Sequence, residues 1–508
     1  MLKNICCFYA IIGKIQNIKG EQILFNSYEF IFIFLPITFL IYFYLNSKKL
    51  TEASKGFLVF SSLFFYSWWN IIYLPLILIS MLFNYSLGNS LSKYKDNKKT
   101  FSKKTILTFG IISNLSLLGY FKYSDFFIEN VNFLIDGQIP TLDLALPLAI
   151  SFFTFQQIAY LVDSYKSETH EYDFLNYAIF VTFFPQLIAG PIVHHKEMMP
   201  QFAQLRNKIK NYKNIVLGIF VFSIGLFKKV VIADTFAVWA NNGFDVAQTL
   251  SLFEAWATSL SYTFQLYFDF SGYTDMAVGA ALLFNIKLPI NFNSPYKALD
   301  IQDFWRRWHM TLSRFLRDYI YIPLGGNKKG KLRTYNNLIA TFILGGLWHG
   351  AGWTFIFWGF LHGFALMIHR LWNSIGFKLP TVIAWFITFN FVNITWVFFR
   401  AKEWEDATKV LTSMFTLGNI VLPSFLVNKF SLLADFGVQF GGIAVNIKGG
   451  VDTAQWLFFA FTIILLKNSV ELKNTFTLTL KSILFCSILL YYAIVSLSNQ
   501  STFLYFNF

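Results

Sequence analysis

The sequence has few charged residues and almost no cysteine. Only 13% of its 508 residues are charged, whereas 55% are hydrophobic and the mean hydropathy is +0.50. Soluble globular domains carry about 25% charged residues, so this composition excludes a chain of such domains. Cys6, Cys7 and Cys486 provide neither a zinc site of the usual spacing nor a disulfide framework. We therefore expect a membrane protein without a metal ion.

Aromatic residues and positive charge are abundant instead. The 63 Phe, 25 Tyr and 14 Trp exceed what one water-facing core can hide, whereas bundled membrane helices show such side chains to acyl chains and interfaces. The net charge of +14 would suggest nucleic-acid binding in a soluble protein. Here, however, Lys and Arg gather in short runs between apolar segments, as in cytoplasmic loops. We interpret the charge as a topology signal beside the lipid bilayer and expect no nucleic-acid partner.

Long apolar runs predict an all-α, polytopic transmembrane bundle of about ten to twelve spans, with additional re-entrant and interfacial helices. The run at 56–87 has lysines on both flanks, which predicts two short helices with a turn near Trp68 and Asn70. The loop after the apolar run 105–121, which contains Lys122, is mostly acidic and is expected on the external side of the membrane. The apolar runs cover residues 29–45, 56–87, 105–121, 144–162, 177–193, 215–233, 255–284, 338–348, 353–371, 382–399, 456–466 and 483–497.

The chain is expected to form one transmembrane domain over residues 24–508. The polar, basic interval 287–333 is expected on the cytoplasmic side and to be the mechanistic centre, whereas 401–453 is mixed and contains surface helices. Codons for Lys19 to Glu21 can form a purine-rich stretch that resembles a ribosome-binding site ahead of Leu24. We therefore hypothesise that residues 1–23 are an extension that the native protein lacks.

His349 lies in an apolar stretch studded with glycines, LGGLWHGAGW at 344–353. An ionisable side chain is costly there, so a functional role is the default expectation. A neutral imidazole can accept a hydroxyl proton during acyl transfer. The alternative is a structural histidine whose imidazole hydrogen-bonds to a neighbouring helix. The flanking glycines weigh against this alternative because they let a ligand approach closely.

His309 lies in DFWRRWHMTLSRFLRDY at 303–319, where aromatic and cationic residues alternate on an expected amphipathic helix. That helix is either an interfacial anchor or a site whose arginines hold the phosphates of a donor such as coenzyme A. The local pattern does not decide between them. The candidate donor-binding residues are Arg306, Arg307, Trp308, Arg314 and Arg317.

Asp269 and Asp275 lie in an aromatic run but are six residues apart, so they do not share one helical face. A carboxylate pair that shares a metal or a proton is not expected, and hydrogen bonding between helices is the simpler role. His362 and His369 are seven apart and are treated as structural or interfacial. His194 and His195 have no resolved role.

Several motifs, in this order, resemble those of the membrane-bound O-acyltransferase family, in particular its bacterial branch of alginate and peptidoglycan O-acetyltransferases. Weaker likeness extends to LFNSYEF at 24–30 and FLYFNF at 503–508, where Asn507 replaces a common Gln. The stronger motifs are FDFSGY (268–273) with Asp275, NFN (291–293), FWRRWH (304–309), RDY (317–319), YIPLGGN (321–327) and GLWHG (346–350).

The resemblance implies a multi-pass protein of the bacterial inner membrane with a central funnel and no permanently bound cofactor. It implies cytoplasmic acetyl-CoA as donor, a periplasmic SGNH-type O-acetyltransferase as partner, and a cell-wall or exopolysaccharide acceptor, with peptidoglycan slightly favoured over alginate. His349 and His309 would be catalytic, and Tyr505 is hypothesised to carry the acyl group. The remaining candidates, which would shape the channel, are Asp269, Tyr273, Asp275, Asn291 and Trp348.

Two alternatives remain open from the sequence. Within the same family, the cargo could be D-alanine passed from a carrier protein to teichoic acid. In a different class, the chain could be a transporter or a flippase of lipid-linked sugars. Such folds often show two similar halves, and the sequence shows no such internal similarity.

Overall fold

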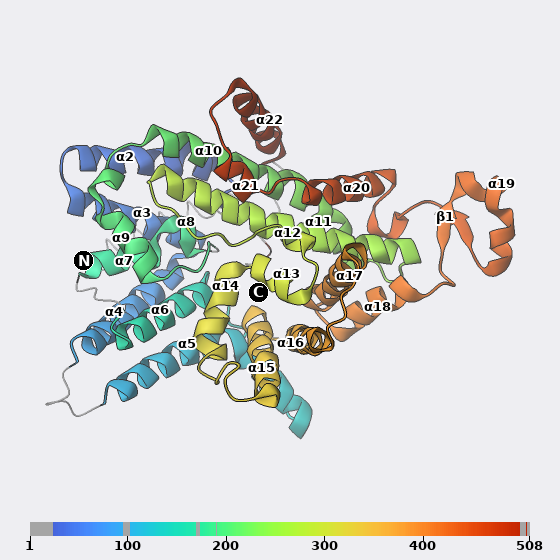
Figure 1. Ribbon diagram of the computed structural model, residues 1–508, viewed down its shortest axis with the longest axis horizontal. Helices are drawn as coiled ribbons and strands as arrows, with labels where there is room; N and C mark the ends of the chain where they lie inside the picture. Colours follow the sequence, from blue (N-terminus) through green and yellow to red (C-terminus); the bar gives the residue numbers. More distant parts are fainter. Residues whose placement is uncertain (1–23, 95–101, 169–172, 189, 498–503, 505–508) are drawn as a thin grey trace.

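A computed structural model describes residues 24–94, 102–168, 173–188, 190–497 and 504. The extension hypothesised at 1–23 and the proposed carrier Tyr505 therefore lie outside the described residues. In the described part of the chain, the fold is helical apart from two three-residue strands, β1 (Val421–Pro423) and β2 (Gln439–Gly441), which pair in parallel. The expected all-α membrane bundle is confirmed (Figure 1).

The helices follow one another along the chain in two groups, before and after residue 300. The first half contains α2 (Leu35–Ser47), α3 (Thr51–Trp69), α4 (Leu74–Ser92), α5 (Lys103–Ile135), α6 (Ile150–Tyr165), α7 (Phe174–Thr182), α8 (Phe184–Leu187), α9 (His195–Ala203), α10 (Tyr212–Phe227), α11 (Asp234–Asn241) and α12 (Leu252–Leu283). The second half contains α13 (Ile301–Arg307), α14 (Met310–Leu316), α15 (Lys331–His349), α16 (Trp353–Ile375), α17 (Thr381–Arg400), α18 (Trp404–Phe415), α19 (Val427–Phe430), α20 (Val451–Leu465), α21 (Ser469–Asn474) and α22 (Leu480–Ser496).

The turn predicted near Trp68 and Asn70 is confirmed. Helix α3 ends at Trp69, and the backbone of Asn70 is extended. The side chain of Asn70 accepts a hydrogen bond from the backbone N–H of Ile72, which starts the short turn leading into α4. An asparagine in this position satisfies a backbone donor that the new helix leaves without a partner. The long apolar run therefore becomes two helices, as its lysine-rich flanks require.

Among the described residues, six helical segments are long and apolar enough to cross a membrane. Helices α12 and α15 are also long enough but are more polar. Helix α12 is buried without interruption from Ser261 to Leu282, so its polar side chains meet other helices rather than lipid. The six segments cover residues 30–47, 71–92, 103–135, 212–246, 353–375 and 381–400, and shorter apolar helices are α20 and α22.

The close crossing of α10 and α12 is built on glycine. A side chain on Gly225 would meet the backbone carbonyl oxygen of Gly272 at 2.5 Å, and one on Gly272 would meet that of Gly225 at 2.7 Å. Facing glycines let two helix backbones approach within contact distance, as in many membrane bundles. This crossing brings the C-terminal end of α10, and the two lysines that follow it at 228 and 229, against the centre of α12 (Figure 1).

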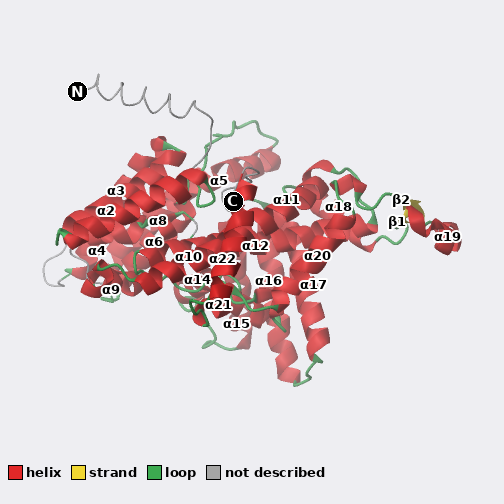
Figure 2. Cartoon of the chain, turned by 90° about the horizontal axis from the view of Figure 1, so that it is seen from above, coloured by secondary structure: helices red, strands yellow, loops and turns green. Residues whose placement is uncertain are grey.

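The interval 401–453 contains the surface helix α18 and a small lobe formed by β1, α19 and β2. The lobe projects from one end of the molecule in two perpendicular views (Figures 1 and 2). Several large apolar side chains in it are exposed, including Phe425 and Phe436. The expected mixture of surface elements is confirmed for this interval.

Candidate functional site

His349 is the last residue of α15 and is buried in the protein, with an exposed fraction of 4%. Its ring lies 4.9 Å from the ring of Trp348, 5.3 Å from that of Trp358 and 5.1 Å from that of Phe399, measured between centroids. The helix ends here because Gly350 adopts an extended backbone. The imidazole therefore faces a dry aromatic interior rather than the lipid-facing surface.

His309 lies at a break in the chain, which corrects the expectation of one amphipathic helix over 303–319. Helix α13 ends at Arg307, α14 begins at Met310, and a π-helical turn, η8 (Arg317–Tyr321), follows. Between the helices His309 has a φ of 42°, in the left-handed region that non-glycine residues rarely adopt. The break turns His309 inward, where it is fully buried, so this stretch is not simply an interfacial anchor.

Asn291 determines which nitrogen of His309 carries the proton. Its side-chain oxygen accepts the backbone N–H of Thr311 at 3.2 Å and lies 3.1 Å from Nδ1 of His309. Because a backbone N–H can only donate, that atom of Asn291 is an acceptor, and Nδ1 of His309 must be the donor. Burial lowers the pKa of His309 to about 3, so the ring is neutral and its Nε2 carries the lone pair.

The ring of Trp348 lies against both histidines. Its ring centroid is 6.4 Å from that of His309 and 4.9 Å from that of His349. The indole also stacks on Phe155 of α6 at 5.0 Å, and only 5% of Trp348 is exposed. Two residues that are 40 positions apart in the sequence, His309 and His349, are thus brought against one indole ring.

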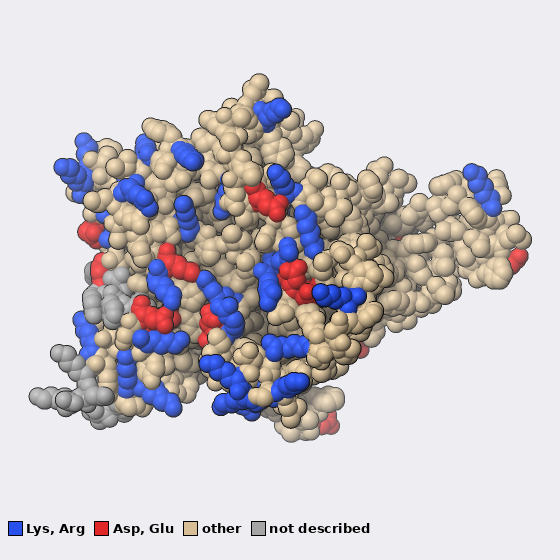
Figure 3. Space-filling model, viewed as in Figure 1, with Lys and Arg blue, Asp and Glu red and all other residues tan. Residues whose placement is uncertain are grey.

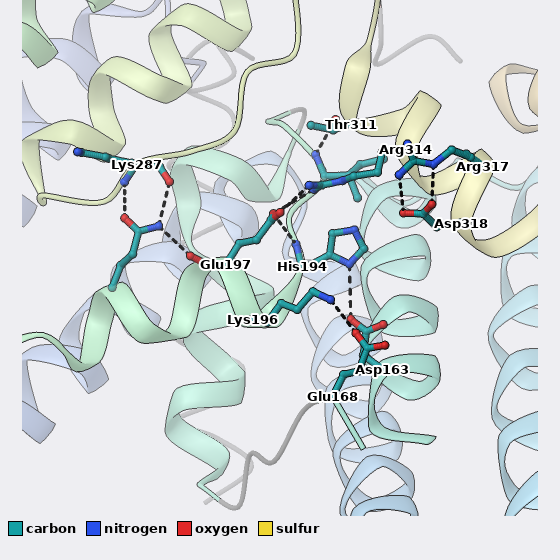
Figure 4. A network of polar contacts seen from close by, with 12 residues as sticks. Asp163, Glu168, His194, Lys196, Glu197, Lys287, Thr311, Arg314, Arg317 and Asp318 are labelled. Carbon is teal, nitrogen blue, oxygen red and sulfur yellow. Dashed lines mark hydrogen bonds and ion pairs between the residues drawn. The ribbon is translucent and has the colours of Figure 1, made fainter. Parts of the chain in front are cut away.

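Three of the four candidate donor-binding arginines form ion pairs with carboxylates. Arg314 makes a bidentate pair with Glu197 of α9, with N···O distances of 2.5 and 3.0 Å (Figure 4). Arg317 pairs with its neighbour Asp318, and Arg307 pairs with Asp303 one turn earlier. Arg306 is exposed and makes no ion pair within the described residues.

Trp308, the remaining candidate for donor binding, is buried among aromatic rings, with an exposed fraction of 2%. That these five residues bind the phosphates of the donor stays a prediction.

A polar cluster that sequence reasoning missed anchors α14 and η8. The hydroxyl of Tyr319 donates to Asp163 of α6 at 2.8 Å and lies 3.1 Å from Nδ1 of His194. Asp163 also lies 3.5 Å from Nδ1 of His194 (Figure 4). Burial, reinforced by the charge of Asp163, raises the pKa of Tyr319 above its ordinary value, so the phenol stays a donor. The partners are more than 100 residues apart, and nothing in the local sequence links them.

Glu197 connects this cluster to Arg314. Burial alone would raise the pKa of its carboxyl group, but the ion pair with Arg314 outweighs burial and the pKa is lowered from its ordinary value. The carboxylate also accepts the backbone N–H of His194 at the start of α9. Glu197 is therefore charged at neutral pH and fixes α14, the helix that begins directly after His309.

Asp269 and Asp275 bind adjacent lysines in the π-helical turn η5 (Lys228–Ala233), which follows α10. Lys229 lies 2.8 Å from Asp269, and Lys228 lies 2.7 Å from Asp275. The carboxylates thus meet separate partners, as their six-residue spacing suggests. Asp269 also accepts the backbone N–H of Leu504 at 3.1 Å, so the residue before Tyr505 reaches the protein interior.

The other predicted residues have plain structural contacts. Tyr273 is buried and stacks on Phe25 at 4.6 Å. His362 accepts the indole N–H of Trp305 at Nδ1, which leaves Nε2 to donate to Thr395. Its tautomer is therefore set, in agreement with a structural role. In the described part of the chain, no group of three or more His, Cys, Asp or Glu residues is placed to hold a metal ion.

Comparison with known proteins provides independent evidence. The model of the membrane-bound O-acyltransferase family matches residues 30–402. A peptidoglycan O-acetyltransferase of Helicobacter pylori is 50% identical over 97% of this chain and 99% of its own length. A probable alginate O-acetylase of Pseudomonas aeruginosa is 39% identical over 82% of this chain and 81% of its own. A teichoic acid D-alanyltransferase of Streptococcus thermophilus is 29% identical over 50% of this chain and 68% of its own.

Proposed function

This chain belongs to the membrane-bound O-acyltransferase family and is a multi-pass membrane O-acetyltransferase, and we propose that it moves acetyl groups from cytoplasmic acetyl-CoA across the bacterial inner membrane for O-acetylation of peptidoglycan. The observation that carries this proposal is the pair of buried histidines, His309 and His349, whose rings both lie against Trp348. Because the family and these relatives are acyltransferases, the transporter alternative is set aside.

The chemistry we assign uses neutral imidazole as a general base. His349 takes the hydroxyl proton of Tyr505, and the phenolate oxygen attacks the thioester carbonyl of acetyl-CoA. The C–S bond breaks, an O–acetyl bond forms, and the coenzyme A thiolate leaves and takes up a proton. The neutral His309, with Nδ1 held by Asn291, presents Nε2 near this path. The aromatic surroundings of His349 keep water away from the activated acyl group.

The lengths of two helices support a site that lies across most of the membrane from the cytoplasmic surface. His349 is 18 residues from the basic start of α15 at Lys331, a rise of about 27 Å along the helix. Lys122 is 19 residues from the basic start of α5 at Lys103, or about 28 Å, and it contacts the backbone of His349. Placing both basic ends on the cytoplasmic side brings these residues to the same depth.

Charge on the surface supports the same orientation. Lys and Arg side chains are spread over the face on which α13 to α15 lie (Figures 1 and 3). This face includes the basic interval predicted to be cytoplasmic, and we assign it to the donor side, where Arg306 is exposed. Arg307, Arg314 and Arg317 bind carboxylates, so a phosphate would have to compete for them or bind beside them.

The acceptor and partner follow from the relatives. The identity of 50% to a peptidoglycan O-acetyltransferase over nearly both full lengths favours peptidoglycan over alginate. D-alanyl transfer is disfavoured because the D-alanyltransferase relative aligns over only half of this chain. We propose that an SGNH-type periplasmic transferase receives the acetyl group and passes it to the sugar hydroxyl. No permanently bound cofactor is needed for this chemistry.

The test is acetyl transfer by purified protein in proteoliposomes with radiolabelled acetyl-CoA, measured as thioester cleavage and as label bound covalently to the protein. His349→Ala should lose about 10²-fold or more of the cleavage rate, because general-base catalysis contributes that much. The control is His369→Ala, a histidine of α16 whose polar partners among the described residues are Asp300 and Asn373. Equal rates for His349→Ala and wild type would refute the proposed site. Tyr505→Phe should abolish covalent labelling, and normal labelling would refute the carrier role.

A further inference from the structure

The end of α15 is held by two consecutive side chains of α5. The ammonium group of Lys122 donates to the backbone carbonyl oxygens of Trp348 and His349, at 2.5 and 3.0 Å. The hydroxyl of Tyr123 donates to the carbonyl oxygen of Leu347 at 2.7 Å. The last three carbonyls of the helix that bears His349 are therefore all bound from one neighbouring helix.

Helix α5 has few other buried contacts. Gly110, Asn114 and Leu118 are the only buried residues among its 33. A lysine in the middle of such an exposed membrane helix is costly unless it has an interior partner. Lys122 does not extend along the helix toward an aqueous surface, as an interfacial lysine would, because its nitrogen binds two interior carbonyls.

The contacts match what the end of a helix needs. The final carbonyls of an α-helix have no partner within the helix, and they carry the negative end of its dipole. The cation of Lys122 satisfies two of these carbonyls, and its nitrogen also lies 5.9 Å from the ring centroid of Trp348. We call the bonds from Lys122 and Tyr123 to the end of α15 the clamp. The same face of α5 also binds the next helix, because Asn130 accepts the indole N–H of Trp353 at the start of α16.

We propose that Lys122 and Tyr123 are positioning residues for acetyl transfer, which hold the backbone of Trp348 and His349 so that the two histidines keep their places beside the indole. This inference rests on the proposed function of His349. Without the clamp, the last turn of α15 frays and His349 moves relative to His309. A displacement of about 1 Å in a catalytic group can cost about 10²-fold in rate.

The test compares Lys122→Met, Lys122→Arg and Tyr123→Phe with a control, Ser124→Ala. The hydroxyl of Ser124 donates to the carbonyl oxygen of Tyr120 in its own helix. The turnover number and the KM for acetyl-CoA are measured in the proteoliposome assay. Lys122→Met should lower kcat by about 10²-fold with KM changed less than threefold, Lys122→Arg should recover most of the rate, and Ser124→Ala should match wild type.

Two results would overturn the inference. One is a Lys122→Met protein that keeps more than a third of the wild-type kcat, and the other is a loss that raises KM in parallel or that Lys122→Arg does not rescue. If Lys122→Met fails to fold, Tyr123→Phe decides, since it removes one oxygen and should lower kcat at constant KM. An inactive His349→Ala beside a normal Lys122→Met would refute this inference alone, whereas a fully active His349→Ala would refute the proposed function.

Discussion

Replacing Lys229 with methionine should destabilise the protein more than the same change at Lys228. Lys229 is almost fully buried and binds Asp269 and Asp234, each at 2.8 Å from its nitrogen. The side chain of Lys229 is 1% exposed, and those of Asp269 and Asp234 are 2% and 10% exposed. Methionine keeps much of the lysine stem's volume but leaves the two carboxylates facing one another without a cation.

The structure bounds the cost. Because both carboxylate oxygens lie 2.8 Å from the same nitrogen, they are at most twice that distance, 5.6 Å, apart. Two unit negative charges at that separation repel by about 3 kcal/mol at an effective dielectric constant of 20. This agrees with the roughly 3–5 kcal/mol lost when one partner of a buried ion pair is removed. Since about 1.4 kcal/mol is a factor of ten, the ratio of folded to unfolded protein falls by a factor of about 10² to about 4 × 10³.

The assay is thermal unfolding in detergent, followed by intrinsic tryptophan fluorescence and by retention of the monodisperse peak. Lys228→Met is the matched control, because its pair with Asp275 is more accessible, with 12% and 11% of the two side chains exposed. Lys229→Met should melt well below Lys228→Met, and adding Asp269→Asn to Lys229→Met should recover part of the loss. The reasoning is refuted if Lys229→Met melts with wild type, or if the double variant is less stable than Lys229→Met.

Two further predictions concern the supports of the histidines. Gly359→Ala should cost about 1–3 kcal/mol of stability and lower activity, because the added methyl group overlaps the carbonyl oxygen of Phe342 where α16 crosses α15. The control is Gly119→Ala, whose added methyl group lies in open space, and this variant should melt at the wild-type temperature. The ion pair of Glu197 with Arg314 should stabilise the fold fully above about pH 4.5 and lose its effect as the pH falls through the lowered pKa of Glu197. Melting curves of wild type and Glu197→Gln should therefore differ at pH 7 and approach one another as the pH falls below the lowered pKa of Glu197, and a constant difference would contradict this prediction.

The sequence predicted the helices and the location of the histidines better than it predicted their partners. Apolar runs and lysine-rich flanks were sufficient for the turn at Asn70, and the apolar, glycine-rich stretch at 344–353 was sufficient for the burial of His349. The prediction of one helix through His309 was wrong, because an amphipathic pattern cannot reveal that a single residue adopts a left-handed backbone conformation and turns its ring inward. Lys122 was expected in an external loop because its neighbours are acidic, but it lies within α5.

What the sequence could not predict depends on contacts between distant segments. The bond from Lys122 to the carbonyl of His349 joins residues 227 positions apart, and that from Tyr319 to Asp163 spans 156. No periodicity of a single helix carries such information, since each partner looks alone like an ordinary polar residue near the end of an apolar run. The six-residue spacing of Asp269 and Asp275 is the exception, because helical geometry alone separates them.

The burial of α12 has a consequence for how the protein is made. A helix with two carboxylates and many hydroxyl groups gains little by leaving the insertion channel for lipid on its own. The apolar segment 212–246, which contains α10 and the lysines of η5, is synthesised earlier and can enter lipid by itself, with Lys229 paired to Asp234 of the same segment. We therefore expect α12 to enter the bilayer against this segment, where Lys228 and Lys229 neutralise Asp275 and Asp269, so that insertion of α12 and its tertiary packing are coupled.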